Sequence, residues 1–307
     1  MTLFSPEIVL QKIKEGYEFR QAELSRLKLE SANLDRAKFL NCYMRGANFT
    51  NVSGKEINFK STNLAFAKFN DVNLSQSNLE RTELNSAIFN DVILDDANAY
   101  KAKLFGIKLN NIKAIHINLS FADLRQASGK DLYFSSANFN KAFCSQIKFE
   151  NINLERAVVT NAGFQNAVIT NSRWHKANLQ NTNLNRSKIT NTCFNDASLV
   201  NSKFAEADIT KAEFIAAELL ETNFCNASLN NIDFTNSMMI SANFEGAELS
   251  NVHFKNVNFQ DANFENTTWH NATFTNCNAS GAVFSDTQGL TDEQKQLLRK
   301  NGALNVT

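Results

Sequence analysis

Between Ala22 and Asp286 the chain repeats a five-residue cassette without an insertion or deletion. The span holds 53 cassettes, and the central residue is Phe in 20 of them and Leu in 19. The residue two positions before the centre is usually small, and the other three are mostly polar. A period of five matches neither the helical 3.6 nor the strand alternation of two, but short fixed periods are typical of solenoids. The sequence therefore predicts a solenoid, whose units bury their apolar side only by stacking.

Two inward and three outward positions per cassette describe one side of a coil. Stacked coils exchange backbone hydrogen bonds as parallel strands do, with a rise of about 4.8 Å per coil. If four cassettes close one coil, the repeat makes about 13 coils and extends over roughly 60 Å.

Cassettes such as Ala32-Asn-Leu-Asp-Arg and Ala262-Asn-Phe-Glu-Asn follow the pattern A-[DN]-[LF]-x-x. In tandem, this pattern resembles the pentapeptide-repeat proteins, and the resemblance extends over nearly nine tenths of the chain. It implies an all-β solenoid, a right-handed quadrilateral parallel β-helix. The handedness and the four-sided cross-section come from the resemblance.

Both ends of the chain predict a short capping helix. Ser5, Pro6 and Gly16 are a cap residue, a first-turn proline and a terminal glycine. Thr291 and Gln294 have capping-box spacing. Such helices cover end strands that otherwise pair with other chains, although the second helix could instead join two copies end to end. We expect an N-terminal cap and entry over residues 1–21, a single repeat domain over 22–286, and a C-terminal cap and tail over 287–307.

Composition limits the function classes. Lys and Arg equal Asp and Glu in number, so the net charge is zero and direct nucleic-acid binding is not expected. Five cysteines without a CxxC pair fit core packing in a reducing compartment. No signal peptide and no apolar run of membrane length occur, so we expect a cytoplasmic protein with no membrane span. Export by a specialised secretion system stays open.

The sequence does not predict catalysis. None of the common catalytic or nucleotide-binding motifs occurs. On a four-sided coil, His116, His175 and His253 share a face but lie at least two coils apart, too far to hold one metal ion. We therefore expect no enzyme activity, no catalytic residues, no metal and no cofactor.

Aromatic side chains at outward positions are the strongest candidates for a binding site. On a four-sided coil, Phe66, Phe105 and Phe143 fall on one face, and Tyr100 and Phe121 lie beside the shared edge. Aromatic residues ringed by Lys and Arg are typical of binding hot spots, although single exposed aromatics are ordinary. The hypothesis is a partner-binding site formed by Phe66, Tyr100, Phe105, Phe121, Phe143, Lys101, Lys103, Arg125 and Lys141.

Two further features leave alternatives open. The centres Ala99, Ala114, Gly129, Cys144 and Val159 are small, and enlarged neighbours indicate either volume compensation or a dent that shapes the aromatic edge. An outward apolar row indicates either simple stacking or a two-fold dimer contact. Its residues are Val200, Ile215, Leu220, Met238 and Ile240.

These patterns favour a non-catalytic protein-binding or scaffold protein with a protein partner. The family resemblance implies an alternative, a DNA mimic that binds type II topoisomerase (DNA gyrase), as some members do. That role usually relies on a strongly acidic surface, and the neutral chain predicts no acidic face. A secreted bacterial effector or adaptor is a further alternative, because the same surface would serve it.

Overall fold

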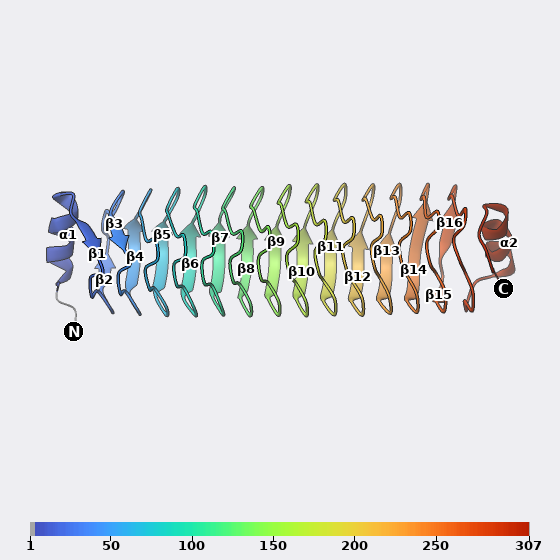
Figure 1. Cartoon of the computed structure of the whole chain (residues 1–307), viewed down its shortest axis with the longest axis horizontal. Helices are drawn as coiled ribbons and strands as arrows, with labels where there is room; N and C mark the ends of the chain where they lie inside the picture. Colours follow the sequence, from blue (N-terminus) through green and yellow to red (C-terminus); the bar gives the residue numbers. More distant parts are fainter. Residues whose placement is uncertain (1–3, 307) are drawn as a thin grey trace. The chain divides into compact units, whose positions relative to one another are not determined.

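The computed structural model describes residues 4–306. It consists of two compact units, one that ends at Ala157 and one that begins at Val158. Each unit is a parallel β-solenoid, and Figure 1 shows the strands of each unit in a regular series. Together the units hold about 13 turns, which confirms the predicted fold class. The single repeat domain over residues 22–286 stays a prediction.

The first unit contains the N-terminal helix and nine strands. All its pairings are parallel: β1 pairs with β3, and β2 and β4 to β9 pair in chain order. The elements are α1 (Pro6–Lys14), β1 (Glu18–Arg20), β2 (Lys28–Glu30), β3 (Lys38–Leu40), β4 (Asn48–Ser53), β5 (Lys68–Asn73), β6 (Ile88–Ile93), β7 (Lys108–Lys113), β8 (Ser128–Tyr133) and β9 (Lys148–Asn153).

The second unit contains seven strands and the C-terminal helix. Strands β10 to β15 pair in chain order, and β16 pairs with β14, again all parallel. The elements are β10 (Val168–Arg173), β11 (Lys188–Cys193), β12 (Asp208–Glu213), β13 (Ser228–Asp233), β14 (Glu248–Lys255), β15 (Thr268–His270), β16 (Thr273–Thr275) and α2 (Asp292–Lys300).

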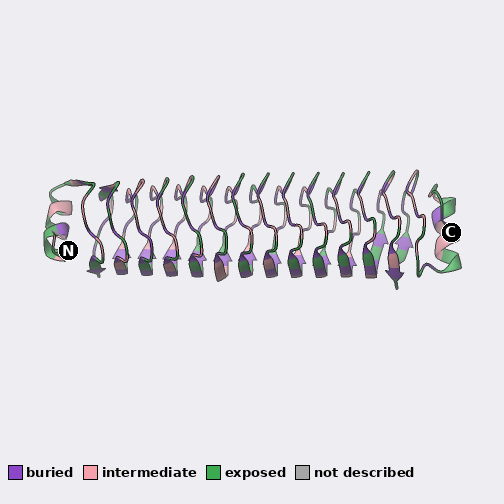
Figure 2. Cartoon of the chain, turned by 60° about the horizontal axis from the view of Figure 1, so that its bottom comes forward, coloured by how far each residue is buried: buried purple, intermediate pink, exposed green. Residues whose placement is uncertain are grey.

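The register shows how many cassettes make one coil. Phe69 pairs with Phe89 and Ile189 with Ile209, so equivalent positions recur every 20 residues. Four cassettes therefore form each coil, as the resemblance implied. The cassette centres are buried throughout the repeat except at Gly129, which is partly exposed. Figure 2 shows buried and exposed residues alternating within the strands.

The corners of the coils have a fixed backbone geometry. The second residue after a centre has a left-handed φ, as at Asn111 (φ 52°) and Asp131 (φ 56°). At many corners the amide of the residue after the left-handed one donates a hydrogen bond to the carbonyl oxygen of the centre, as from Ala37 to Leu34 at 3.0 Å. Asn, Asp and Gly tolerate this conformation with little strain, which explains why corner positions are polar and rich in Asn.

Both predicted helices are confirmed. The hydroxyl of Ser5 accepts a hydrogen bond from the amide of Ile8 at the start of α1. At α2, Thr291 and Gln294 form the predicted capping box. The Gln294 side chain also donates to the carbonyl of Ala272 at 2.6 Å, which fixes α2 to the last coils of its unit.

The small centres are largely compensated by their neighbours. Ala99 lines an internal apolar void of about 30 Å³, together with the enlarged residues Ile107, Ile112 and Ile117. A void of this size is about that of one water molecule. The interior of the first unit is therefore nearly filled, which supports volume compensation.

Candidate protein-binding surface

The aromatic residues predicted to form a site lie along one side of the first unit. Bridges between successive coils place Tyr43, Asn63, Glu83, Lys103, Asp123 and Phe143 in one line. With 20 residues per coil, Phe66 and Phe105 lie at the corner after this line, and Tyr100 and Phe121 at the corner before it. We call Phe66, Tyr100, Phe105, Phe121 and Phe143 the aromatic edge.

These five side chains differ in exposure. Phe66, Phe105 and Phe143 are exposed, with relative accessibilities of 49%, 37% and 56%. Tyr100 and Phe121 are half-buried and pack edge to face, with ring centroids 5.7 Å apart. The edge therefore combines three projecting rings with one packed aromatic pair.

Phe121 lies between two lysines. The Lys101 ammonium is 5.6 Å from the Phe121 ring centroid, and that of Lys141 is 5.5 Å away. Lys101 also lies 5.1 Å from the ring of Tyr100. A cation within about 6 Å of a ring is attracted by the negative face of the aromatic system. These contacts hold two ammonium groups at the surface of the packed pair.

Two arginines lie over the other rings. The Arg125 guanidinium is 6.0 Å from the Phe105 ring, and Asp123 pairs with it at 2.7 Å. The hydrogen bond from Arg125 holds the pKa of Asp123 below its ordinary value. Arg45 lies 4.1 Å from the Phe66 ring, a contact that sequence reasoning missed because Arg45 belongs to the preceding coil.

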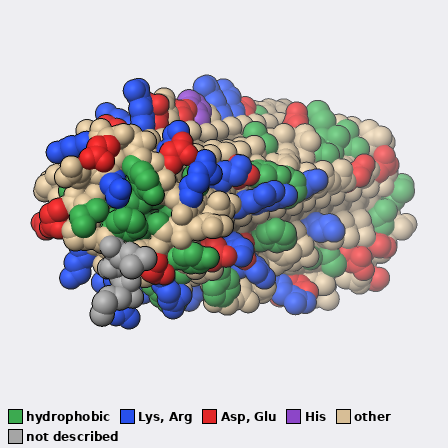
Figure 3. All heavy atoms as spheres, turned by 60° about the vertical axis from the view of Figure 1, so that its left-hand side comes forward, with side chains coloured by type: hydrophobic (Ala, Val, Ile, Leu, Met, Phe, Trp, Pro, Cys, Tyr) green, Lys and Arg blue, Asp and Glu red, His purple; other side chains and the backbone are tan. Residues whose placement is uncertain are grey.

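The charges on this side do not all cancel. Lys60 pairs with Glu80, and Lys103 with Glu83 at 2.7 Å, so Lys103 binds a carboxylate and not a ring. Among the described residues, no ion pair includes Arg45, Lys101 or Lys141. The aromatic edge therefore has a surplus of positive charge. Figure 3 shows Lys and Arg side chains beside hydrophobic ones on the visible face.

The predicted apolar row is only partly assembled in the second unit. Val200, Leu220 and Ile240 occupy the same outward position in successive coils and are half-buried. Met238 lies on the same coil as Ile240 and is 44% exposed. Ile215 is half-buried at a different corner. The row remains a candidate dimer contact.

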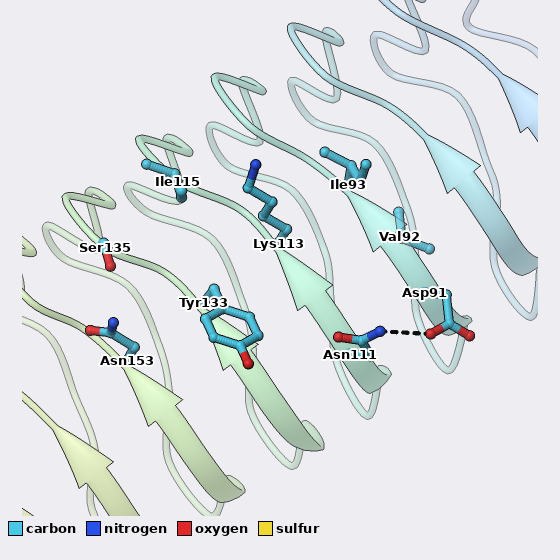
Figure 4. Close-up of a pocket in the computed structure, with 9 residues that line it drawn as sticks. All are labelled: Asp91, Val92, Ile93, Asn111, Lys113, Ile115, Tyr133, Ser135 and Asn153. Carbon is cyan, nitrogen blue, oxygen red and sulfur yellow. Dashed lines mark hydrogen bonds between the residues drawn. The ribbon is translucent and has the colours of Figure 1, made fainter.

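A groove on another side of the first unit was missed by the sequence reasoning. It encloses about 610 Å³ and is open to solvent. In Figure 4, Lys113 and Tyr133 project from β7 and β8 near Ile115, and Asn111 donates to Asp91 at 2.8 Å. The other lining residues are Val92, Ile93, Ser135 and Asn153. The sequence signal that could have identified the groove was Tyr133, an aromatic residue at an outward position. In the structure Tyr133 is 46% exposed.

Although the net charge is zero, acidic and basic residues are unevenly distributed along the chain. Residues 196–293 contain 14 Asp and Glu but only three Lys and no Arg. In the first unit Lys and Arg outnumber Asp and Glu by 21 to 17, and in the second they are outnumbered by 14 to 10. This segment is therefore strongly acidic, whereas the absence of one acidic face stays a prediction. Counting charge in windows along the sequence would have found the acidic segment.

Four of these carboxylates gather near one corner of the second unit. Glu245 and Glu265 occupy the same position in successive coils, since the amide of Gly246 bonds to the carbonyl of Glu265. Glu248 is three residues from Glu245, and Asp286 lies one coil beyond Glu265. No ion pair within the described residues includes these four. We call Glu245, Glu248, Glu265 and Asp286 the acidic row.

Metal-binding clusters and reactive thiols are not assembled in the part of the chain that the structure describes. No group of three or more His, Cys, Asp or Glu side chains in residues 4–306 is arranged to hold a metal ion. Burial raises the pKa of all five cysteine thiols, which keeps them protonated and poorly nucleophilic near neutral pH. Neither described helix has the length and apolar character that crossing a membrane requires.

Models of pentapeptide repeats match most of the chain. The model described as pentapeptide repeats (8 copies) matches residues 18–53, 57–96, 73–111, 117–156, 160–199 and 258–288. A second model, described as a pentapeptide repeat region, matches residues 187–258. No curated protein matches the chain.

Several solved structures are similar to this chain. HetL, a pentapeptide repeat protein involved in heterocyst differentiation regulation from the cyanobacterium Nostoc sp. strain PCC 7120, is 20% identical with a TM-score of 0.37 over 81% of this chain and 96% of its own. A trypsin-treated form of QnrB1, a plasmid-mediated fluoroquinolone resistance protein, is 19% identical with a TM-score of 0.44 over 68% of this chain and 94% of its own. A protein from the Arabidopsis thaliana thylakoid lumen is 30% identical with a TM-score of 0.20 over 38% of this chain and 77% of its own.

Proposed function

The chain belongs to the pentapeptide-repeat family, and from that membership we propose that it is a non-catalytic scaffold that binds a protein partner through its aromatic edge. The observation that carries the proposal is the aromatic side chain at two corners of the coils, Phe66 and Phe121. Both have a left-handed φ, 60° and 58°, at corner positions that elsewhere are mostly Asn, Asp, Ser or other polar residues.

A bulky residue in this conformation is strained. The left-handed region costs an L-residue about 1–2 kcal/mol, and Asn avoids part of this by local hydrogen bonding. Folding alone therefore favours Asn at both positions. Other corners carry this conformation with polar residues, and among the described non-glycine corners only Phe66, Phe121 and Ala216 are apolar. The two aromatic rings therefore depart from the corner pattern, which supports a role for them outside folding.

The surroundings of the rings support protein binding. Aromatic and Arg side chains dominate interface hot spots, and Phe66 with Arg45 and Phe105 with Arg125 supply two such pairs. The edge lies on stacked coils without long loops, so little backbone entropy is lost when a partner binds.

The proposal is tested by removing the edge while keeping the fold. The variant replaces Phe66 and Phe121 by Asn, which suits the left-handed corner, and Tyr100, Phe105 and Phe143 by Ser. We expect wild-type far-ultraviolet circular dichroism and an unchanged or slightly higher unfolding temperature, because corner strain is relieved. In an affinity capture from cell lysate, a partner retained by the wild type is lost by this variant.

A matched control replaces Tyr17 and Tyr133, two exposed aromatics outside the edge. The control should retain the partner. If the edge variant folds and still captures the same protein, the edge is not the binding surface. Loss of the partner only in the control would move the site to Tyr17 or to the groove around Tyr133.

A second candidate function is favoured by one observation. The excess of carboxylates in residues 196–293 gives this segment the charge that mimicry of DNA requires. The measurement that separates it is a supercoiling assay with purified DNA gyrase and increasing amounts of the protein. An unchanged supercoiling rate removes this candidate, and an effector or adaptor role then depends on the partner that the capture identifies.

A further inference from the structure

We propose that the aromatic edge of one copy of this protein binds the acidic row of a second copy. The inference rests on the proposed function, since it takes the aromatic edge as the binding surface and names what that surface recognises. The two surfaces lie in different units of the chain, so the contact is heterologous and each copy can use both. Heterologous contacts generate rings when they close and open chains when they do not.

The cations of the aromatic edge lack carboxylate partners. Lys101 and Lys141 are held against Phe121 at 5.6 and 5.5 Å. Arg45 is held against Phe66 at 4.1 Å. In the described part of the chain none of the three is in an ion pair, whereas Glu80, Glu83 and Asp123 on the same side are already bound to other cations. The ring contacts fix these charges in place, so a negatively charged surface can meet them without much loss of side-chain entropy.

The acidic row has the complementary property. Glu245, Glu248 and Asp286 are exposed, and Glu265 is half-buried. Two earlier carboxylates near the same corner differ, because Glu206 pairs with Arg186 at 3.0 Å and Asp208 with Lys188 at 3.6 Å. The acidic row therefore lies on later coils than Arg186 and Lys188, and its charge is available to a second molecule.

The spacing of the two surfaces is compatible. Lys101 and Lys141 lie two coils apart, about 10 Å, and Glu245 and Glu265 one coil apart, about 5 Å. Long Lys and Glu side chains span this difference. Complementary patches of this kind steer association and fix its register, and a net charge of zero leaves no overall repulsion between copies.

The test uses charge reversal in the full chain, followed by sedimentation velocity. The wild type should self-associate at low ionic strength, about 0.05 M, and dissociate at about 0.5 M, where the screening length is shorter than the separation of most of these charges. The variants K101E/K141E and E245K/E265K should each associate about tenfold more weakly than the wild type at low salt, because like charges then face each other.

Recombining the reversed charges makes the test specific. An equimolar mixture of the two variants should regain association, since each chain then carries the complement of the other. The four-fold variant K101E/K141E/E245K/E265K should also associate like the wild type. The control K108E/K148E changes the net charge equally at two exposed lysines with the same spacing on a neighbouring face, and it should leave association unchanged.

Several outcomes overturn the proposal. A wild type that stays monomeric at low salt and high concentration rules out the contact. Association that charge reversal does not weaken, but that replacement of Val200, Leu220 and Ile240 by Ser abolishes, assigns self-association to the apolar row. Failure here differs from failure of the proposed function, because a monomeric protein can still capture a different partner through the aromatic edge and lose it in the aromatic variant.

Discussion

Gly129 is a cassette centre whose size is strictly limited by the backbone of the neighbouring coil. A β-carbon built on it would lie 2.5 Å from the carbonyl oxygen of Leu109 and 2.9 Å from the Leu109 β-carbon. Backbone atoms of a paired strand cannot move away as the end of a side chain can. The glycine therefore allows β7 and β8 to keep their register at a centre where the two neighbouring coils carry Leu109 and Phe149.

We expect Gly129→Ala to destabilise the protein by about 1–3 kcal/mol, the usual effect of overpacking a closed interior. Urea unfolding followed by circular dichroism measures this change. The matched control is Gly54→Ala at another centre, where the new β-carbon meets the flexible end of Leu74 at 3.2 Å. Gly54→Ala should leave the free energy of unfolding nearly unchanged. Alanine lowers the conformational entropy of the unfolded chain, and this gain offsets the cost of a small shift of the Leu74 side chain. Equal destabilisation by both variants would contradict this account.

At the scale of elements, most of the fold could be predicted from the sequence. The five-residue period identified the coils, and cap residues identified both helices, because each signal is local and repeats or ends at a defined residue. The placement of Arg45 over Phe66 could not be predicted, since it depends on side-chain direction at a corner between coils. The groove beside Tyr133 likewise depends on how neighbouring turns project.

The cap of α2 gives a prediction at this scale. Thr291→Ala removes the hydroxyl that accepts a hydrogen bond from the backbone amide of Gln294, and so it breaks the capping box. We expect a loss of about 1 kcal/mol, mostly by fraying of α2. Thermal unfolding measures the change, and hydrogen exchange of the α2 amides locates it. Thr291→Ser keeps the cap and should behave as the wild type, so an equal loss in the Ser variant would show that the hydroxyl is not the cause.

At the scale of the whole molecule, the two units have different cores. In the second unit, Phe204, Phe224, Phe244 and Phe264 form a stacked column with successive ring centroids 4.8–5.0 Å apart. A second column, through Phe194, Phe214 and Phe234, has spacings of 4.9 and 5.2 Å. The middle of the first unit instead combines small centres with the apolar void. Stacked aromatic pairs contribute about 0.5–1.5 kcal/mol beyond their buried area.

This difference predicts unequal local stability, because opening energies in a repeat protein depend on each coil and its neighbours. Amides of β7 and β8 should exchange with deuterium at least about tenfold faster than those of β12 and β13, since about 1.4 kcal/mol corresponds to a factor of ten. Hydrogen exchange with mass spectrometry measures this in the intact chain. The experiment needs about 0.5 M salt, because repulsion among the carboxylates of the second unit would otherwise lower its protection. Equal protection in the two regions, or faster exchange in β12 and β13, would show that aromatic stacking does not set the order of opening.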